Sequence, residues 1–115
     1  MKNNILEEKS KQVALEIIEI TKILQKNNFA LSNQILKSGT SIGANIAEST
    51  YAQSKSDFIS KLCIAQKEAG ETKYWLELLF ESNLIDEKKY LKLYNMITEM
   101  LKILAKIILT AKKDW

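Results

Sequence analysis

The chain contains no histidine, no arginine and no proline, and it has only three glycines and one cysteine among its 115 residues. Without histidine, a di-iron site built from Glu-x-x-His pairs is excluded, and so is any zinc site that needs histidine. The absence of arginine argues against bidentate recognition of guanine. The shortage of proline and glycine argues against an all-β fold, which needs many turn residues. The lone Cys63 cannot form an internal disulfide, and it lacks a histidine that would act as its base.

The composition predicts a single globular domain over residues 1–115, because 46% of the residues are hydrophobic and 27% are charged. The charged N-terminal segment does not resemble a signal peptide, and no uncharged apolar run reaches the roughly 18 residues that a membrane span requires. We therefore expect a cytoplasmic protein that does not bind a membrane. The 17 lysines and 14 acidic residues leave a net charge of +3. This charge permits weak attraction to nucleic acid, although an AT-biased genome explains the lysines equally well.

Apolar residues recur at alternating spacings of three and four residues along most of the chain, which is typical of amphipathic helices. The first helix is expected over about residues 4–26, and a second begins near Leu31 or Ser32. A third helix is expected to begin at a Ser54 cap and to end at Asn83, which suits the left-handed position that closes a helix. A fourth opens at an Asp86 cap. Four helices with short connections predict an all-α fold, an antiparallel up-down four-helix bundle.

The fourth helix carries two apolar stripes, which is more than one face of a lone bundle needs. The first stripe contains Tyr90, Tyr94, Ile97, Leu101, Leu104 and Ile108, and the second contains Leu93, Met96, Met100, Ile103 and Ile107. Either this helix is centrally buried, or its second stripe meets another subunit.

Gly39, Gly43 and Ala47 lie four residues apart and form one ridge of the second helix. Glycine inside a helix costs roughly 0.5–1 kcal/mol relative to alanine, so two glycines on one ridge suggest a close helix contact. The third helix has small residues, Ala65 and Ala69, in its middle layers. We expect the glycine ridge to pack against these alanines.

Five polar residues near this ridge are candidates for chemistry. Glu48, Glu68 and Glu71 come from neighbouring helices, and an all-carboxylate metal site is conceivable. The stronger interpretation is structural, with Glu48 and Glu71 bonded to lysines or backbone groups, and we expect no metal or cofactor. Asn45 is a candidate ligand-binding residue or a buried residue that sets helix register. Ser41 is expected to bond back to a carbonyl of its own helix.

Tyr74 and Trp75, with Lys67 and Lys73 nearby, have the composition of a stacking surface for single-stranded nucleic acid. The stronger interpretation places Trp75 in the core or at a subunit interface, because such stacking surfaces usually lie on sheets or loops. Together with the apolar excess of the fourth helix, this pair favours self-association.

Two segments, SGTSIGANIAES and SKSDFISKLCIAQKEAGETKYWLELL, resemble the bacterial four-helix-bundle proteins known as intervening-sequence or S23-type proteins. That family is named after members encoded within large-subunit ribosomal RNA genes. The resemblance covers about residues 31–85. Its motif contains Ser41, Ile42, Asn45, Ile46, Ala47, Glu48, Ala65, Glu68, Glu71, Tyr74, Trp75 and Leu76. The chain departs from the family pattern at Gly43 and at Ser49–Thr50.

The resemblance implies an up-down bundle that assembles into a ring, typically a pentamer. A relative of the family is the accessory protein of diversity-generating retroelements, which works with a reverse transcriptase and RNA. Binding of nucleic acid is therefore a further implication of the resemblance.

Two functions remain in competition, and neither is enzymatic. The first is a homo-oligomeric bundle, with a pentamer as the expected state, that binds RNA or DNA through surface lysines. The candidate contacts are Lys88, Lys89, Lys92, Lys102, Lys106, Lys112 and Lys113 on the fourth helix, and Lys55, Lys61, Lys67 and Lys73 on the third. The alternative is a protein–protein scaffold that has no contact with nucleic acid. An enzyme that uses a metal or a small ligand has the least support.

Overall fold

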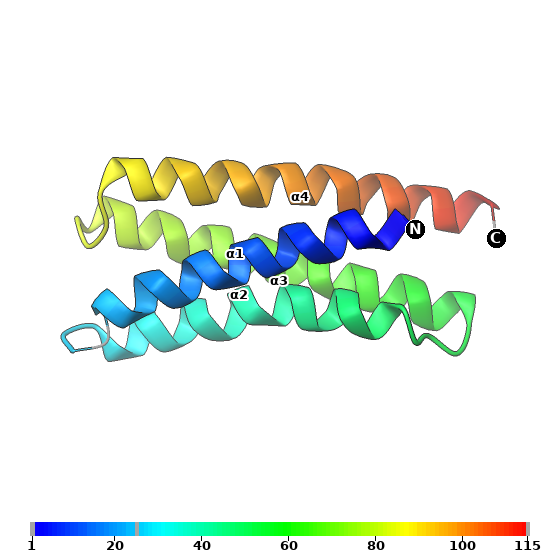
Figure 1. Ribbon diagram of the computed structural model, residues 1–115, viewed down its shortest axis with the longest axis horizontal. Helices are drawn as coiled ribbons and strands as arrows, with labels where there is room; N and C mark the ends of the chain where they lie inside the picture. The colour runs from blue at the N-terminus through cyan, green and yellow to red at the C-terminus, as the bar shows by residue number, and fades with distance from the viewer. Residues whose placement is uncertain (1, 25, 115) are drawn as a thin grey trace.

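The computed structural model describes residues 2–24 and 26–114, which form four helices connected by short turns (Figure 1). The helices are α1 (Lys2–Leu24), α2 (Phe29–Ser49), α3 (Lys55–Glu81) and α4 (Glu87–Asp114). Successive helices run in opposite directions, and among the described residues each helix packs only on the two beside it, in the cyclic order α1, α2, α3, α4. The elongated bundle measures 47 × 21 × 20 Å. The predicted all-α up-down four-helix bundle is confirmed.

Helix α1 crosses the bundle at an angle (Figure 1). Near its C-terminal end it lies on α2, where the Ser32 hydroxyl donates to the Thr21 carbonyl at 3.5 Å. Toward its N-terminal end it approaches α4, where Lys9 pairs with Glu99 at 3.2 Å. Because of this tilt, the first half of α1 leaves the second half of α2 partly uncovered.

The core is built from the stripes that periodicity predicts for the first three helices. The three- and four-residue spacings predict a buried seam of Ile35, Gly39, Ile42 and Ile46 in α2, and all four are buried. In α3 they predict Phe58, Leu62, Ala65, Ala69, Thr72, Leu76 and Leu79, of which only Phe58 is half-buried and the others are buried. The fully buried large side chains are Leu6, Ile17, Ile35, Ile42, Ile46, Leu62, Leu76, Leu79, Leu93, Ile97, Met100 and Leu104. Alternating apolar residues therefore specify which face of each helix is buried, because burial of that face is the main force that assembles a bundle.

Helix α4 buries residues from both of its predicted stripes. Ile97 and Leu104 from the first stripe are fully buried, and so are Leu93 and Met100 from the second. The remaining apolar residues flank this centre and are half-buried or nearly buried against it, namely Tyr90, Tyr94, Met96, Leu101, Ile103, Ile107 and Ile108. The two stripes are thus one broad face, and most of its apolar excess is buried within a single chain. Met96, Ile103 and Ile107 of the second stripe are only half-buried, so its contact with another subunit stays a prediction.

Helix α2 begins earlier than the sequence indicates, at Phe29 rather than at Leu31 or Ser32. Ser32 does not cap the helix, because its side chain is buried against α1. The backbone amide of Asn28 donates to the Leu24 carbonyl at 2.9 Å, which closes the end of α1 just before α2 starts. The predicted end of the first helix near Lys26 is therefore two residues too late.

The predicted caps of α3 are confirmed. At its start, Ser54 Oγ accepts a hydrogen bond from the Asp57 amide at 3.0 Å. At its end, Asn83 has a φ of 63°, and the Leu84 amide donates to the Leu79 carbonyl at 2.8 Å. This arrangement satisfies a carbonyl that the helix end leaves without a partner, as a left-handed closing residue does.

Asp86 caps α4 as predicted, since its Oδ1 accepts from the Lys89 amide at 2.8 Å. That hydrogen bond, together with the charge of Lys89, lowers the pKa of the Asp86 carboxyl from 3.8. A lowered pKa means that the ionised cap stabilises the fold above the ordinary pKa, and that this stabilisation is lost as the pH falls through the lowered value.

We expect Asp86→Asn to keep the cap, because asparagine is also a favoured capping residue, but to lose this acid dependence. Urea unfolding of both proteins at pH 7 and pH 2 measures the effect. Wild type should be the more stable protein at pH 7, and its advantage should vanish at pH 2. An equal difference at the two pH values would show that the Asp86 charge contributes nothing to the cap.

Candidate functional site

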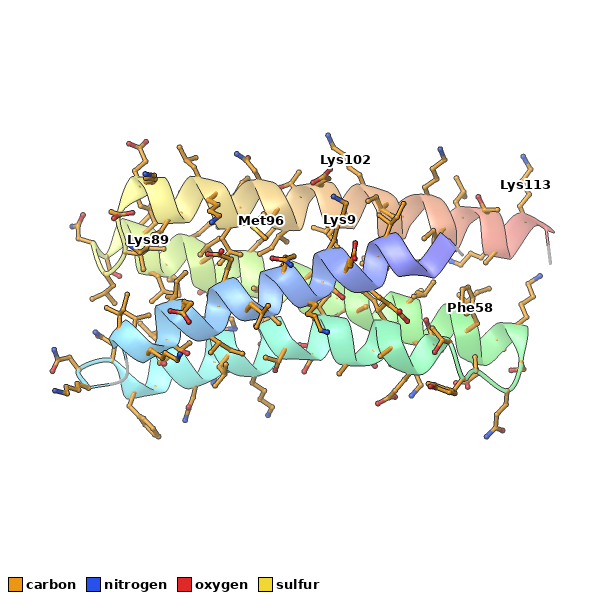
Figure 2. The ribbon with its side chains drawn as sticks, in the orientation of Figure 1. Lys9, Phe58, Lys89, Met96, Lys102 and Lys113 are labelled. Atoms are coloured by element: carbon orange, nitrogen blue, oxygen red, sulfur yellow. The ribbon has the colours of Figure 1, made fainter. Side chains whose placement is uncertain are left out.

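Five lysines on the solvent side of α4 are exposed and make no ion pair with any side chain that the structure describes, namely Lys88, Lys102, Lys106, Lys112 and Lys113. Figure 2 shows Lys102 and Lys113 pointing away from the bundle. We call Lys102, Lys106 and Lys113 the lysine row, because their spacings of four and seven residues place them on one line of a helix. Of the seven lysines proposed from α4, these three form the most continuous positive feature.

The other two lysines proposed from α4 are held in ion pairs. Lys89 Nζ lies 3.4 Å from Asp86 Oδ2, and Lys92 Nζ lies 3.0 Å from Glu16 Oε2 on α1. Their charges are partly neutralised, and Lys92 helps to join α1 to α4. Exposed pairs of this kind contribute little to stability, but they make these lysines weaker candidates for contacts with phosphate.

Most of the lysines proposed from α3 already contact other residues of the chain or are half-buried. Lys61 pairs with Glu48 of α2 at 3.0 Å, and this hydrogen bond and charge raise the pKa of the Lys61 ammonium. Lys73 Nζ lies 4.4 Å from the centre of the Tyr94 ring, in a cation–π contact with α4. Lys55 is half-buried at the start of α3, whereas Lys67 is exposed. Only Lys67 among them resembles the lysines of the row.

Charge is distributed unevenly along the bundle. One half contains the start of α1, the end of α2, the start of α3 and the end of α4 (residues 5–13, 40–67 and 100–113). We call it the lysine end, and its charged residues are Lys9, Lys11, Lys55, Lys61, Lys67, Lys102, Lys106, Lys112, Lys113, Glu7, Glu8, Glu48 and Asp57. In the opposite half, carboxylates outnumber lysines. A net charge of only +3 therefore conceals a strongly positive end and a mildly negative one.

The glycine ridge faces α1, and its predicted packing against Ala65 and Ala69 of α3 is wrong. A Cβ atom at Gly39 would collide with the Ile17 side chain, and one at Gly43 would lie 3.3 Å from Ser10 Oγ. Both glycines lie on the side of α2 that turns toward α1. Sequence spacing identifies a ridge but not the partner, because both neighbouring helices offer small or slender side chains.

Helices α2 and α3 are joined instead by a buried polar contact that sequence reasoning missed. Thr72 Oγ1 lies 2.9 Å from Ser38 Oγ, and it also bonds the Glu68 carbonyl at 2.8 Å. Both hydroxyl residues are almost completely buried. Ser38 and Thr72 each occupy a core position within an otherwise apolar repeat, and that is the signal by which the contact is detectable from sequence.

Beside the glycine ridge, the tilt of α1 leaves an open groove of about 520 Å³. Ala14, Gly43 and Ala47 are among its lining residues, together with Glu7, Glu8, Ser10, Lys11, Thr50 and Tyr51. Gly43 is half-buried at this groove, whereas Gly39 is buried. The ridge therefore runs from a close helix contact into an open surface.

The predicted polar site residues are brought into separate local contacts. Ser41 Oγ donates to the Lys37 carbonyl at 2.7 Å, as predicted. Asn45 Nδ2 donates to the Ser41 carbonyl at 2.8 Å, so its hydrogen bond lies within its own helix and does not set the register between helices. Glu48 is exposed and bonds Lys61, which agrees with the structural interpretation of that carboxylate.

The two remaining carboxylates lie half-buried on α3. Glu71 Oε2 accepts from Trp75 Nε1 at 3.1 Å, whereas the Glu68 backbone carbonyl accepts from Thr72. Within residues 2–24 and 26–114, no group of three or more acidic, histidine or cysteine side chains is arranged to hold a metal ion. Nor does any helix there have the length and apolarity to cross a membrane.

Tyr74 and Trp75 have different environments although they are adjacent. Tyr74 is 53% exposed, whereas Trp75 is half-buried and packs against the core. Their rings meet edge to face with centres 5.1 Å apart. The core interpretation of Trp75 is thus supported, and of this pair only Tyr74 has an exposed ring.

A second aromatic cluster, between α3 and α4, was not anticipated. The rings of Phe80 and Tyr90 stack with centres 4.3 Å apart, and Tyr94 follows at 5.4 Å from Tyr90. Burial, followed by the nearby Glu77 charge, raises the pKa of the Tyr90 hydroxyl. This cluster packs α3 against α4 next to their connecting turn, at the end of the bundle opposite the lysine end.

Comparisons with known proteins agree with this architecture. A solved structure, described as a protein of unknown function from the S23 ribosomal protein family of Bacteroides thetaiotaomicron, is 49% identical to the chain. The match has a TM-score of 0.92 and covers 96% of this chain and 100% of that one. No curated protein matches. The sequence model of the family described as 23S rRNA-intervening sequence protein matches residues 2–106, and the chain belongs to that family.

Proposed function

We propose that this protein is a non-catalytic, homo-oligomeric bundle that binds RNA or DNA through the lysine end. The observation that carries the proposal is the lysine row, whose charges are exposed and not neutralised by any described carboxylate. Lysines in such a position release condensed counterions when they meet phosphates, and this release drives binding that is independent of sequence. The family description, which refers to 23S rRNA, makes RNA the first ligand to test.

Self-association, with a pentamer as the expected state, is the second part of the proposal. Several large apolar side chains stay exposed on α1, on α2 and in the turn after α2, including Leu15, Phe29 and Tyr51. On α2, the Thr40 hydroxyl donates to the Leu36 carbonyl at 2.8 Å. A second subunit could therefore cover this hydroxyl without breaking its hydrogen bond. A ring of five chains would carry a formal charge five times larger and would present several lysine rows to one ligand.

The lysine row is tested by replacing Lys102, Lys106 and Lys113 together with glutamine. A matched control replaces Lys22, Lys26 and Lys37, which are also exposed but lie in the opposite half of the bundle and are not among the proposed contacts. Binding to a mixed RNA pool is measured by fluorescence anisotropy over a range of salt concentrations. Loss of three phosphate contacts should reduce the steepness of the plot of log K against log salt concentration by about 2. The control should keep the wild-type slope.

If wild type shows no binding at low salt, or binding that does not depend on salt, nucleic-acid binding is wrong. If both triple variants lose affinity equally, net charge and not the lysine row is responsible.

A protein–protein scaffold without nucleic-acid contact is the second candidate, and it is favoured by the open groove between α1 and α2. Purification from nuclease-treated native lysate distinguishes the two candidates. A stoichiometric protein partner that remains after nuclease treatment supports the scaffold, whereas a preparation that loses only nucleic acid counts against it.

A further inference from the structure

We infer that the lysine row contacts the phosphate backbone of a double-stranded nucleic acid and does not read its bases. This inference rests on the proposed function and specifies the class of ligand. Along a helix that rises 1.5 Å per residue, Lys102, Lys106 and Lys113 extend over about 16 Å. They form a straight row on one rigid helix, which is continuous through this segment.

The surroundings of the row keep it positive. The α4 segment 100–113 contains no carboxylate, Asp114 follows only at its end, and the Glu99 side chain just before it is turned toward Lys9 of α1. Glu7 and Glu8, the acidic residues of the nearby half of α1, line the groove on the α2 side instead. A phosphate chain laid along the row therefore meets no acidic side chain of α4 between residues 100 and 113.

The fold gains little from two members of the row. Lys113 lies in the last turn of α4, where the negative end of the helix dipole favours a cation. Lys102 and Lys106 lie well inside the helix, and like charges four residues apart destabilise it. Neither side chain makes an ion pair with a described residue that would offset this repulsion. An anionic ligand would offset it.

Single-stranded ligands are disfavoured because the α4 segment from Lys102 to Lys113 contains no aromatic residue on which bases stack. Stacking on aromatic side chains contributes about 1–3 kcal/mol per base when a flexible strand is bound. The exposed residues between the lysines of the row are Ala105, Leu109, Thr110 and Lys112. Tyr90 and Tyr94 belong to the aromatic cluster with α3, at the other end of the bundle. Between Lys102 and Lys113, the described part of α4 thus has charge but no stacking surface.

A duplex suits such a row better. Base pairing already fixes the positions of its phosphates, so a rigid row of lysines binds them without ordering a flexible strand. The chain has no arginine for bidentate contacts with guanine, and lysine meets phosphate as a point charge. Binding should therefore be independent of base sequence and strongly dependent on salt.

The test compares a 20-base-pair RNA duplex, the matching DNA duplex and the separated strands of each, all of mixed sequence. Fluorescence anisotropy gives their dissociation constants at three salt concentrations for wild type, Lys102→Gln/Lys106→Gln and the control Lys26→Gln/Lys37→Gln. We expect each duplex to bind at least 10-fold more tightly than its strands. The row variant should lose several-fold in duplex affinity with a slope smaller by about 2, and the control should match wild type.

Each other result is decisive. If no nucleic acid binds at low salt, the proposed function fails and this inference fails with it. If single strands bind as tightly as duplexes, the inference is overturned while nucleic-acid binding stands. If duplexes bind but the row variant matches wild type, the contacts lie elsewhere and the inference is again overturned. A preference between the RNA and DNA duplexes identifies which helical form the row fits.

Discussion

Gly39→Leu is expected to lower the free energy of unfolding by about 3 kcal/mol or more, or to prevent folding altogether. Gly39 is buried, and even a Cβ atom there would collide with the Ile17 side chain of α1. Overpacking a well-filled core typically costs 1–3 kcal/mol and sometimes more, and a leucine brings three further carbon atoms into this contact. Urea unfolding followed by circular dichroism measures the loss.

Gly70→Leu is the matched control, because it introduces the same residue into the interior of another helix. Gly70 is exposed, and nothing lies within 4 Å of a Cβ atom there. Leucine has a better helix propensity than glycine, so this variant should be as stable as wild type or slightly more stable. If Gly39→Leu and Gly70→Leu unfold at the same urea concentration, α1 does not approach α2 as closely as the structure shows.

Gly43 separates a close contact from an open one within the same ridge. Its Cβ would lie 3.3 Å from Ser10 Oγ, and the position opens into the groove between α1 and α2. A leucine at Gly43 has room to extend into that groove, so the variant should lose clearly less stability than Gly39→Leu. From sequence alone the two glycines were expected to be equivalent, because periodicity does not reveal where tilted helices diverge.

Met100→Ala is expected to cost about 2–5 kcal/mol, which is the usual range for truncating a buried methionine. Met100 is fully buried at the centre of the broad α4 face, although the sequence places it in the second apolar stripe. Its removal leaves a cavity that the surrounding leucines and isoleucines fill only in part. The same urea experiment gives the magnitude, with each protein at a concentration where its oligomeric state is known.

Leu109→Ala provides the comparison on the same helix, since Leu109 is 68% exposed. Truncating an exposed side chain usually changes the free energy of unfolding by less than about 0.5 kcal/mol. If Met100→Ala is equally harmless, the second stripe of α4 is not buried within one chain. Its apolar residues would then need a partner subunit to cover them.

Much of the fold is predictable from local chemistry. The Ser54 and Asp86 caps and the left-handed Asn83 each depend on residues within a few positions of one another, so the sequence reveals them directly. The start of α2 was misjudged because Ser32 resembles a cap. It is used instead for a contact with Thr21 on another helix.

Pairing between helices was harder to predict. The Ser38–Thr72 contact and the direction of the glycine ridge depend on the rotation and tilt of whole helices, which three- and four-residue spacings leave open. The lysine row lies within the predicted set of lysines. The structure was needed to show that Lys89 and Lys92 differ from the row, because they pair with Asp86 and Glu16. A list of surface lysines does not show which charges neighbouring carboxylates neutralise.

The native mass of the protein, measured by light scattering with and without nucleic acid in low salt, tests the central claim most directly. One chain has a mass of 13.2 kDa. We predict a particle of several chains, with five expected, that gains mass when nucleic acid is added and loses that gain when salt is raised. A particle whose mass does not change with nucleic acid at any salt concentration would contradict the claim.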